Sequence, residues 1–385
     1  LLLSWLAPAE ADEAKDRFDF FTLRVGGEVR NTLAGDVDGD GLRDLLVAHV
    51  VYDDDARAVT KFLSLFRQRP AGFEAKADDL WRLPEDAVAI DLANVAPPEK
   101  DLEIVVVRET RIDAFAFSQG KIVREPLPLA ANESLFTMPD WSAVRLWDFA
   151  RDFDGDGVDE LLLFAEKGTL IYKRGEDGRY VVSQRLATPV KNKVMTYDEH
   201  EWLADRVETF SVRFDRVIPN VVLREWDGDG KPDLVFAWND RVQVHRGLGG
   251  GRFEEAARPL DLRVFSYEHL LRYSRDAAIL RTEVEDVSGD GLADVLVSRT
   301  AFANLEGQNW LDIFYNKKGE IVRDPHPRVR TDGLTLGPVV ADFNADGRND
   351  LLVWYIETGI GALVNYILLG QADIHHSFYL TRADG

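Results

Sequence analysis

The chain has 385 residues, of which 45% are hydrophobic and 30% are charged, a balance typical of a folded protein rather than a disordered one. Its formal net charge of −22 argues against binding to nucleic acid or to an anionic membrane through basic patches. It has no cysteine, which excludes disulfides, thiolate metal sites, cysteine nucleophiles and covalent c-type haem.

The first eleven residues, Leu1 to Ala11, are mostly apolar or small and open with three leucines. An apolar run followed by small residues is typical of the end of a secretory signal peptide. We therefore expect residues 1–16 to be a signal-peptide remnant or N-terminal tail, with an ordinary apolar strand or helix as the alternative. No other stretch reaches the roughly 18–20 apolar residues that a membrane-spanning helix needs.

An acidic nine-residue pattern recurs along the rest of the chain. Positions 1, 3 and 5 carry Asp or another oxygen donor, position 6 is always Gly, and position 9 is Asp or Glu. We name the five copies loop 1 (36–44), loop 3 (152–160), loop 4 (225–233), loop 5 (286–294) and loop 6 (342–350). An eroded copy at Asp91–Ile104, loop 2, lacks the central carboxylates. Intervals of roughly 55–75 residues suit four-stranded propeller blades with variable loops.

The spacing of the acidic residues favours calcium. Oxygen atoms at alternate positions of a tight loop can converge on one cation, and calcium takes roughly six to eight such ligands. Position 7 can add a backbone carbonyl, and Gly at position 6 allows the positive φ of a sharp turn. We therefore predict about five Ca²⁺ sites, with ligands at positions 1, 3, 5, 7 and 9. The predicted ligands are Asp36, Asp38, Asp40, Leu42, Asp44, Asp152, Asp154, Asp156, Val158, Glu160, Glu225, Asp227, Asp229, Lys231, Asp233, Asp286, Ser288, Asp290, Leu292, Asp294, Asp342, Asn344, Asp346, Arg348 and Asp350. Glu225 and Ser288 depart from Asp, so those two sites are expected to be weaker.

An EF-hand begins in the same way, but it needs Glu at position 12 and a helix after it. Position 12 is apolar in all five copies, and so are positions 10 and 11. A short apolar run after a turn is typical of a strand that is buried on both faces, as in a propeller blade. This excludes the EF-hand and dockerin interpretations. Metal-free Asp-Gly turns are the remaining alternative, which five-fold repetition disfavours.

The loops and their period resemble the FG-GAP/VCBS repeat family, whose best-known fold is the integrin α-subunit propeller. The resemblance covers about residues 20–385, and Leu336-Gly337-Pro338 also resembles the family's Gly-Ala-Pro element. It implies an all-β fold, a β-propeller of four-stranded antiparallel blades. Six motifs favour six blades, with seven as the alternative. Residues 17–385 are expected to form this single domain.

Each predicted blade runs from a first strand through the loop to a second, third and outer strand. In the first blade these last three are expected at 44–52, 59–67 and 73–81. Later third strands are expected at 169–173, 241–245, 312–315 and 363–368, and outer strands at 180–184 and 253–257. Phe18–Val25 is expected to pair near the C-terminal strand and close the ring.

Two insertions, at about 191–213 and 262–281, lie between an outer strand and the next first strand, opposite the acidic loops. In the integrin-like family that face meets ligands; short helices that plug the channel or cover blade edges are the alternative. The insertions contain His200 and His269, for which a shared metal or acid–base role is disfavoured. The adjacent His375 and His376 should point to opposite faces of a strand.

The predicted function is a calcium-stabilised, non-enzymatic binding module or scaffold subunit that is secreted, periplasmic or on the cell surface and binds a protein partner. The alternatives are a calcium-dependent polysaccharide lyase or hydrolase and a carbohydrate-binding lectin. The sequence has no Gly-x-Ser-x-Gly elbow, no His-Glu-x-x-His motif and no P-loop.

Overall fold

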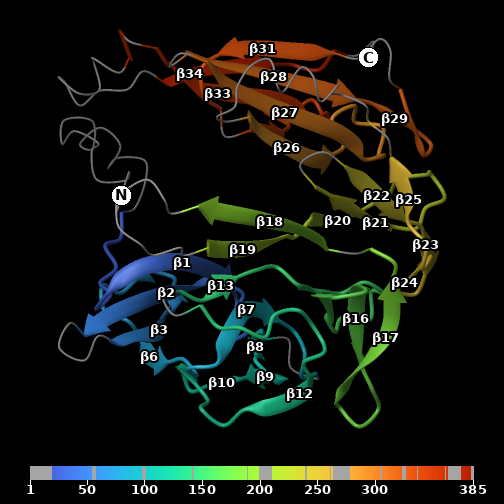
Figure 1. Ribbon diagram of the computed structural model, residues 1–385. Coiled ribbons are helices and arrows are strands. Elements are labelled where there is room, and N and C mark those ends of the chain that lie inside the picture. Colours follow the sequence, from blue (N-terminus) through green and yellow to red (C-terminus); the bar gives the residue numbers. More distant parts are fainter. Residues whose placement is uncertain are drawn as a thin grey trace. The chain divides into compact units, whose positions relative to one another are not determined.

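The computed structural model describes residues 20–53, 58–97, 101–140, 143–188, 190–198, 210–238, 241–260, 262, 278–303, 306–322, 327–335, 337–359, 361–362 and 374–382. Within these ranges the fold is all-β, with strands β1 to β34 and no helix beyond two residues at 361–362 (Figure 1). The described part of the chain contains no helix with the length and hydropathy that a membrane span requires. The chain divides into two compact units, 1–185 and 186–385.

The first unit contains three antiparallel sheets that follow one another along the chain. Sheet 1 is β1 (Glu28–Gly35), β2 (Asp44–Asp53), β3 (Ala58–Phe66) and β6 (Asp79–Arg82). Sheet 2 is β7 (Ala87–Ala93), β8 (Glu103–Arg108), β9 (Arg111–Phe115) and β12 (Leu127–Ala131), with β13 (Arg145–Leu146) parallel to β7. Sheet 3 is β14 (Ala150–Arg151), β15 (Glu160–Ala165), β16 (Gly168–Arg174) and β17 (Tyr180–Leu186).

The second unit repeats the arrangement. Sheet 4 is β20 (Asn220–Arg224), β21 (Asp233–Ala237), β22 (Val242–His245) and β25 (Arg258–Leu260). Sheet 5 is β26 (Ala278–Glu285), β27 (Asp294–Ala303), β28 (Glu306–Phe314) and β31 (Arg328–Asp332). Sheet 6 has three described strands, β32 (Pro338–Ala341), β33 (Asp350–Ile356) and β34 (Ile374–Tyr379).

Hydrophobic clusters join three pairs of neighbouring sheets. One cluster joins sheets 1 and 2 through residues such as Leu46, Leu63 and Ile104, all fully buried. Further clusters join sheet 4 to sheet 5 and sheet 5 to sheet 6. All six residues of β15 are buried, so the apolar run after loop 3 is covered on both faces. The prediction of doubly buried second strands is confirmed there.

Four short hairpins shift the predicted outer strands. They are β4 (Gln68–Arg69) with β5 (Gly72–Phe73), β10 (Phe117–Ser118) with β11 (Lys121–Ile122), β23 (Gly247–Gly249) with β24 (Arg252–Phe253), and β29 (Asn316–Lys317) with β30 (Glu320–Ile321). Each follows a third strand. The outer strands of sheets 1 and 4 therefore begin at Asp79 and Arg258, later than the predicted starts at 73 and 253, because the hairpins use those residues.

Three other expectations differ from the described structure. The insertion at 191–213 contains an antiparallel hairpin, β18 (Lys191–Asp198) with β19 (Phe210–Val217), where helices were the alternative. The strand that pairs with β33 is β34, whereas the predicted third strand at 363–368 lies outside the described residues. The described end of Phe18–Val25 meets sheet 1, because Arg24 bridges Lys76 and its N–H donates to the Ala75 carbonyl at 2.8 Å.

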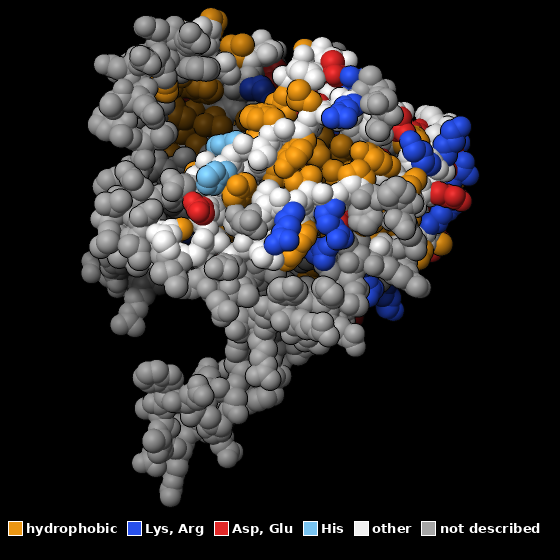
Figure 2. Space-filling view, turned by 90° about the horizontal axis from the view of Figure 1, so that it is seen from above, with side chains coloured by type: hydrophobic (Ala, Val, Ile, Leu, Met, Phe, Trp, Pro, Cys, Tyr) orange, Lys and Arg blue, Asp and Glu red, His pale blue; other side chains and the backbone are white. Residues whose placement is uncertain are grey.

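Sheet 6 carries apolar side chains on its exposed surface. Val339, Ile374 and Phe378 are 44%, 52% and 59% exposed. The phenyl rings of Phe343 and Phe378 meet edge to face at 5.4 Å between centroids. Figure 2 looks down on this end of the view in Figure 1 and shows apolar side chains gathered there.

Candidate metal-binding loops

Each acidic loop joins the first and second strands of its own sheet. Loop 1 connects β1 to β2, loop 3 connects β14 to β15, and loops 4, 5 and 6 connect β20 to β21, β26 to β27 and β32 to β33. Position 9 is the first residue of the second strand every time. The pairing of the two strands therefore fixes both ends of every loop.

The carboxylate at position 1 winds the loop around itself. In loop 1, Asp36 accepts hydrogen bonds from the N–H groups of Gly39 at 2.8 Å and Gly41 at 2.9 Å. The carboxylate at position 5, Asp40, accepts the N–H of Leu42 at 2.8 Å. Loops 3 and 5 repeat all three bonds. We predicted that position 7 supplies a backbone carbonyl ligand. In these loops its N–H donates a hydrogen bond to the carboxylate at position 5.

The acid at position 9 is a buried anchor. Asp44, Glu160, Asp233, Asp294 and Asp350 are at most 3% exposed. One oxygen accepts the N–H of position 2, as Asp233 does from Trp226 at 2.8 Å. In loops 1, 4, 5 and 6 the other oxygen accepts an N–H just beyond the third strand. Burial raises the pKa of Asp44 to about 6, although its two backbone hydrogen bonds oppose the rise.

The start of loop 2 was predicted at the wrong residue. The N–H of Val95 donates to Glu103 at 2.9 Å, as position 2 does to position 9 elsewhere, so Asn94 rather than Asp91 occupies position 1. Asp91 lies in β7, and its carboxylate accepts the N–H groups of Phe149 at 2.7 Å and Ala150 at 2.9 Å. Burial raises the pKa of Asp91 to about 7. Loop 2 therefore keeps the anchor, and its described residues, 94–97 and 101–103, form no cluster of carboxylates.

Hydrogen bonds join the loops of successive sheets within a unit. The position 1 carbonyl of Asp36 accepts the N–H of Leu102 at 3.2 Å, and that of Asn94 accepts the N–H of Asp159 at 2.9 Å. In the second unit, the N–H of Ala293 donates to Glu225 at 2.9 Å. The side-chain amide of Asn349 donates to the carbonyl of Asp286 at 2.7 Å. Sheets 1 to 3 and sheets 4 to 6 thus present their loops side by side.

Three loops bring carboxylates close enough to share one ion. The groups are Asp36, Asp38 and Asp40; Asp152, Asp154 and Glu160; and Glu225, Asp227 and Asp229, each with ligand atoms within 4.8 Å of one another. Among the described atoms of the five acidic loops, two side-chain oxygens, Oδ1 of Asp38 and Oγ of Ser288, are buried and have no hydrogen-bond partner, and Oδ1 of Asn94 in loop 2 is a third. A set of oxygen donors alone, with such atoms left over, fits a hard cation such as Ca²⁺.

Each of these three clusters also contains a basic side chain that the sequence did not indicate. The Arg67 guanidinium meets Asp38 at 3.0 Å, and the Arg246 guanidinium meets both Asp227 and Asp229 at 2.8 Å. Lys173 Nζ contacts Asp154, Glu160 at 2.9 Å and Asp156 at 3.4 Å. Arg67 and Arg246 directly follow a third strand, and Lys173 is the next-to-last residue of one.

The contacts of Lys173 change the titration of its partners. Burial alone would raise the pKa of Asp154, but the hydrogen bond and the charge of Lys173 outweigh burial and hold it below its usual value. The opposite effect acts on Lys173: burial favours loss of its proton, yet the carboxylates raise its pKa overall. The pair is therefore ionised at neutral pH.

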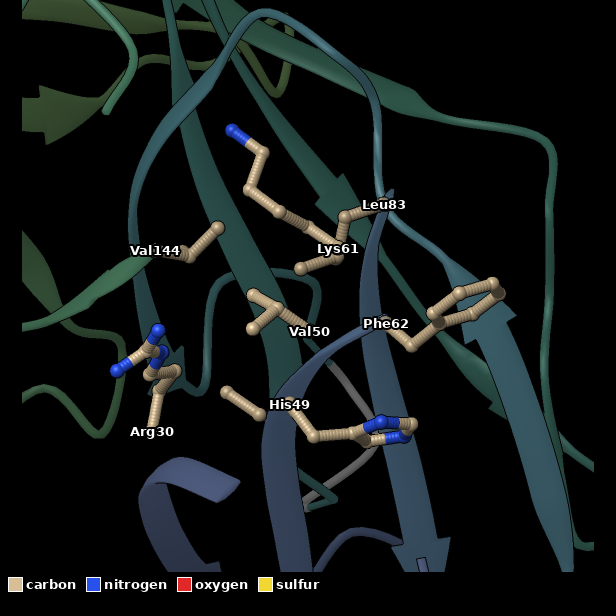
Figure 3. Close-up of a pocket in the computed structure, with 8 residues that line it drawn as sticks. Arg30, His49, Val50, Lys61, Phe62, Leu83 and Val144 are labelled. Carbon is tan, nitrogen blue, oxygen red and sulfur yellow. The ribbon is translucent and has the colours of Figure 1, made fainter. Parts of the chain in front are cut away.

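A separate group of polar side chains in sheet 1 is held by contacts within the sheet and with its neighbour. Lys61 is 8% exposed, and its Nζ donates to the carbonyls of Ala87 and Asp140, both at 3.2 Å. The His49 and Phe62 rings stack at 5.6 Å, and His49 Nε2 lies 2.9 Å from Ser64 Oγ. Figure 3 shows Lys61 extending away from the His49 and Phe62 rings. These contacts account for the buried charge without a ligand.

Of the histidines for which the sequence disfavoured a metal or acid–base role, His200 and His269 lie outside the described residues. His375 and His376 are adjacent on β34 and pair with Tyr355 and Trp354 of β33. The His375 ring stacks on Tyr355 at 4.9 Å.

Comparison with known proteins supports the repeat. Residues 284–353 match the family model of the FG-GAP-like repeat, a segment that includes loops 5 and 6. The expectation of FG-GAP repeats is therefore confirmed. No curated protein matches the chain.

Two solved structures show a distant similarity to the chain. One is from work on the recognition of non-reducing terminal N-acetylglucosamine by an Agrocybe aegerita lectin, with 15% identity and a TM-score of 0.45 over 94% of this chain and 87% of that one. The other is the V. cholerae biofilm matrix protein Bap1, with 12% identity and a TM-score of 0.32 over 86% of this chain and 79% of that one.

Proposed function

We propose that the chain is a calcium-stabilised β-propeller that acts outside the cytoplasm as a binding module or scaffold subunit, without a catalytic site. The observation that carries the proposal is the repeated unit: six sheets, each with a loop between its first and second strands, and hydrogen bonds that join neighbouring loops within each unit. One blade for each sheet gives a six-bladed propeller.

Calcium has a structural role in this proposal. Each ion would neutralise carboxylates that otherwise repel one another at the junction of the first and second strands. Extracellular calcium modules bind with dissociation constants of about 10⁻⁴–10⁻³ M, which suits a compartment rich in calcium. At ten times the dissociation constant, each site adds about 1.4 kcal/mol to the free energy of unfolding. Five ions would also offset about 10 of the excess negative charges and so reduce self-repulsion.

The exposed apolar side chains of sheet 6 support a binding role. Ile374, Phe378 and Leu380 are each more than half exposed, and contiguous exposed apolar surface often marks an interaction site. A protein partner is the occupant that we favour, because the net charge of −22 disfavours nucleic acid.

Native mass spectrometry of the protein purified from its source in calcium-containing buffer tests the proposal. We expect the chain to carry several Ca²⁺ ions and a stoichiometric partner that dissociates when EGTA is added. A chain that carries calcium but no partner would contradict the scaffold role. A chain that binds no calcium and cleaves a polysaccharide would favour the enzymatic alternative.

A further inference from the structure

One position of the third strand varies together with the acidity of the loop beside it. In every sheet, position 10 pairs with an aromatic residue of the third strand, except in sheet 4, where it pairs with His245. We call the residue after that partner the third-strand position. It is Arg67, Ala116, Lys173, Arg246, Tyr315 and Leu380 in sheets 1 to 6.

The third-strand position is basic only where position 3 of the loop is Asp. Sheets 1, 3 and 4 combine a basic residue with Asp38, Asp154 and Asp227. Position 3 is the neutral Ser288 in sheet 5, Asn344 in sheet 6 and Ala96 in sheet 2. A carboxylate at position 3 and a basic residue at the third-strand position thus occur together in three sheets, and the other three sheets have neither.

The contacts show why the two changes go together. The side chain at the third-strand position reaches the position 3 carboxylate in all three sheets that have it. In loops 5 and 6 the described ion pairs are at position 5. Lys317 lies 3.7 Å from Asp290, and Arg348 lies 2.7 Å from Asp346. Because Lys317 is 64% exposed, its contact is largely screened by solvent.

Loop 3 shows the consequence for metal binding. Lys173 Nζ lies among the carboxylates of Asp154, Asp156 and Glu160. A calcium ion needs ligand oxygens at about 2.3–2.6 Å, so an ion bound to these three groups would take the volume that the ammonium occupies. Calcium can bind there only if Lys173 moves out.

We propose that Arg67, Lys173 and Arg246 are built-in counter-cations that close loops 1, 3 and 4 in the absence of metal and compete with Ca²⁺ for their carboxylates. This inference rests on the proposed calcium binding and adds which residues set its strength. The expected order of calcium affinities therefore changes. Ser288 predicted a weaker site in loop 5, but loop 5 has no counter-cation at its third-strand position to compete with Ca²⁺.

Calcium titration of the full chain by calorimetry, with the K173M variant and thermal unfolding in EGTA, tests this. Met preserves much of the aliphatic side chain and removes the charge. We expect one Ca²⁺ site to tighten about tenfold in K173M, because the ion no longer displaces a cation. The melting temperature in EGTA should fall, and saturating Ca²⁺ should restore it. K317M is the matched control and should change neither quantity.

The outcomes separate this inference from the proposed function. If the unaltered chain binds Ca²⁺ and K173M binds it with the same affinity, the counter-cation role is wrong and the calcium role stands. If neither protein binds Ca²⁺, the proposed calcium role fails and the competition fails with it. R246M makes the same test in the second unit should K173M not fold, and the same outcomes decide it.

Discussion

Loops 3 and 6 share two hydrogen bonds from backbone N–H groups but differ in their side chains. In both, position 1 accepts the N–H of position 6, at 2.9 Å from Gly157 and 2.8 Å from Gly347. In both, the buried acid at position 9 holds the N–H of position 2. Loop 3 adds Asp154 and Lys173, whereas loop 6 has Asn344 and Leu380 at those places. The backbone bonds are therefore what the sheet requires, and the charge of the loop can vary.

Loop 6 differs in its packing as well. Phe343, at position 2, is 41% exposed, whereas its counterpart Phe153 is 9% exposed. Ala345, at position 4, has a φ of 59°, where the other four loops have Gly with positive φ. Loop 6 therefore contains backbone strain and exposed apolar surface that loop 3 lacks.

The largest expected effect concerns the buried acid at position 9, which loops 3 and 6 share. D350A and E160A should each lower the free energy of unfolding by about 2–4 kcal/mol, because a buried N–H at position 2 loses its acceptor. Urea unfolding in EGTA measures this without any contribution from metal. D156A, at a position exposed to solvent, is the control and should cost far less. Equal losses in all three variants would contradict the anchor role.

Loop 2 sharpens the comparison because it keeps the anchor, whereas its described residues form no acid cluster. Its neighbour Asp91 has a pKa of about 7 in the folded chain, well above the value of about 3.9 expected after unfolding. The folded state therefore binds the proton more tightly, and the stability that this adds is complete below pH 4 and lost as the pH rises to 7. The difference in unfolding free energy between the unaltered chain and D91N should fall by about 1.4 kcal/mol per pH unit between pH 5 and 7.

Urea unfolding in EGTA at pH 5, 6, 7 and 8 provides this measurement. The difference should level off above pH 7, where Asp91 is ionised in both states. A difference that stays constant from pH 5 to 8 would contradict the raised pKa.

The smallest expected effect concerns position 4. A345G should raise the free energy of unfolding by about 0.5 kcal/mol, because relief of the left-handed strain exceeds the entropy that Gly adds to the unfolded chain. G155A in loop 3 should lower it by about 1 kcal/mol, since Gly155 has a φ of 80° and nothing within 4 Å of an added Cβ. Thermal unfolding of the two variants gives the signs, and the same sign for both would contradict the strain.

The sequence predicted the parts of the fold that depend on local pattern. The five loops, the apolar second strands and the antiparallel sheets follow from Asp-Gly turns and short apolar runs, and the structure has them at the expected residues. The start of loop 2 was wrong because pairing of Ala93 with Glu103 sets it, and that pairing leaves no mark on an eroded motif. The four short hairpins were missed because strands of two or three residues show no periodicity.

The counter-cations lie beyond what a local motif can show. Lys173 and Asp154 are 19 residues apart, and Arg67 and Asp38 are 29 apart, so only the register of the third strand brings them together. That register can be counted from position 10 once the pairing is known. With it, the basic residues at 67, 173 and 246 become visible in the sequence.

Thermal unfolding of the calcium-loaded chain and of the same sample in excess EGTA tests the central claim most directly. If the five loops bind Ca²⁺ at the junctions of their strands, chelation should lower the melting temperature by about 10 °C or more, and added Ca²⁺ should reverse the change. An identical melting temperature in EGTA and in millimolar Ca²⁺ would contradict the proposal that calcium stabilises this fold.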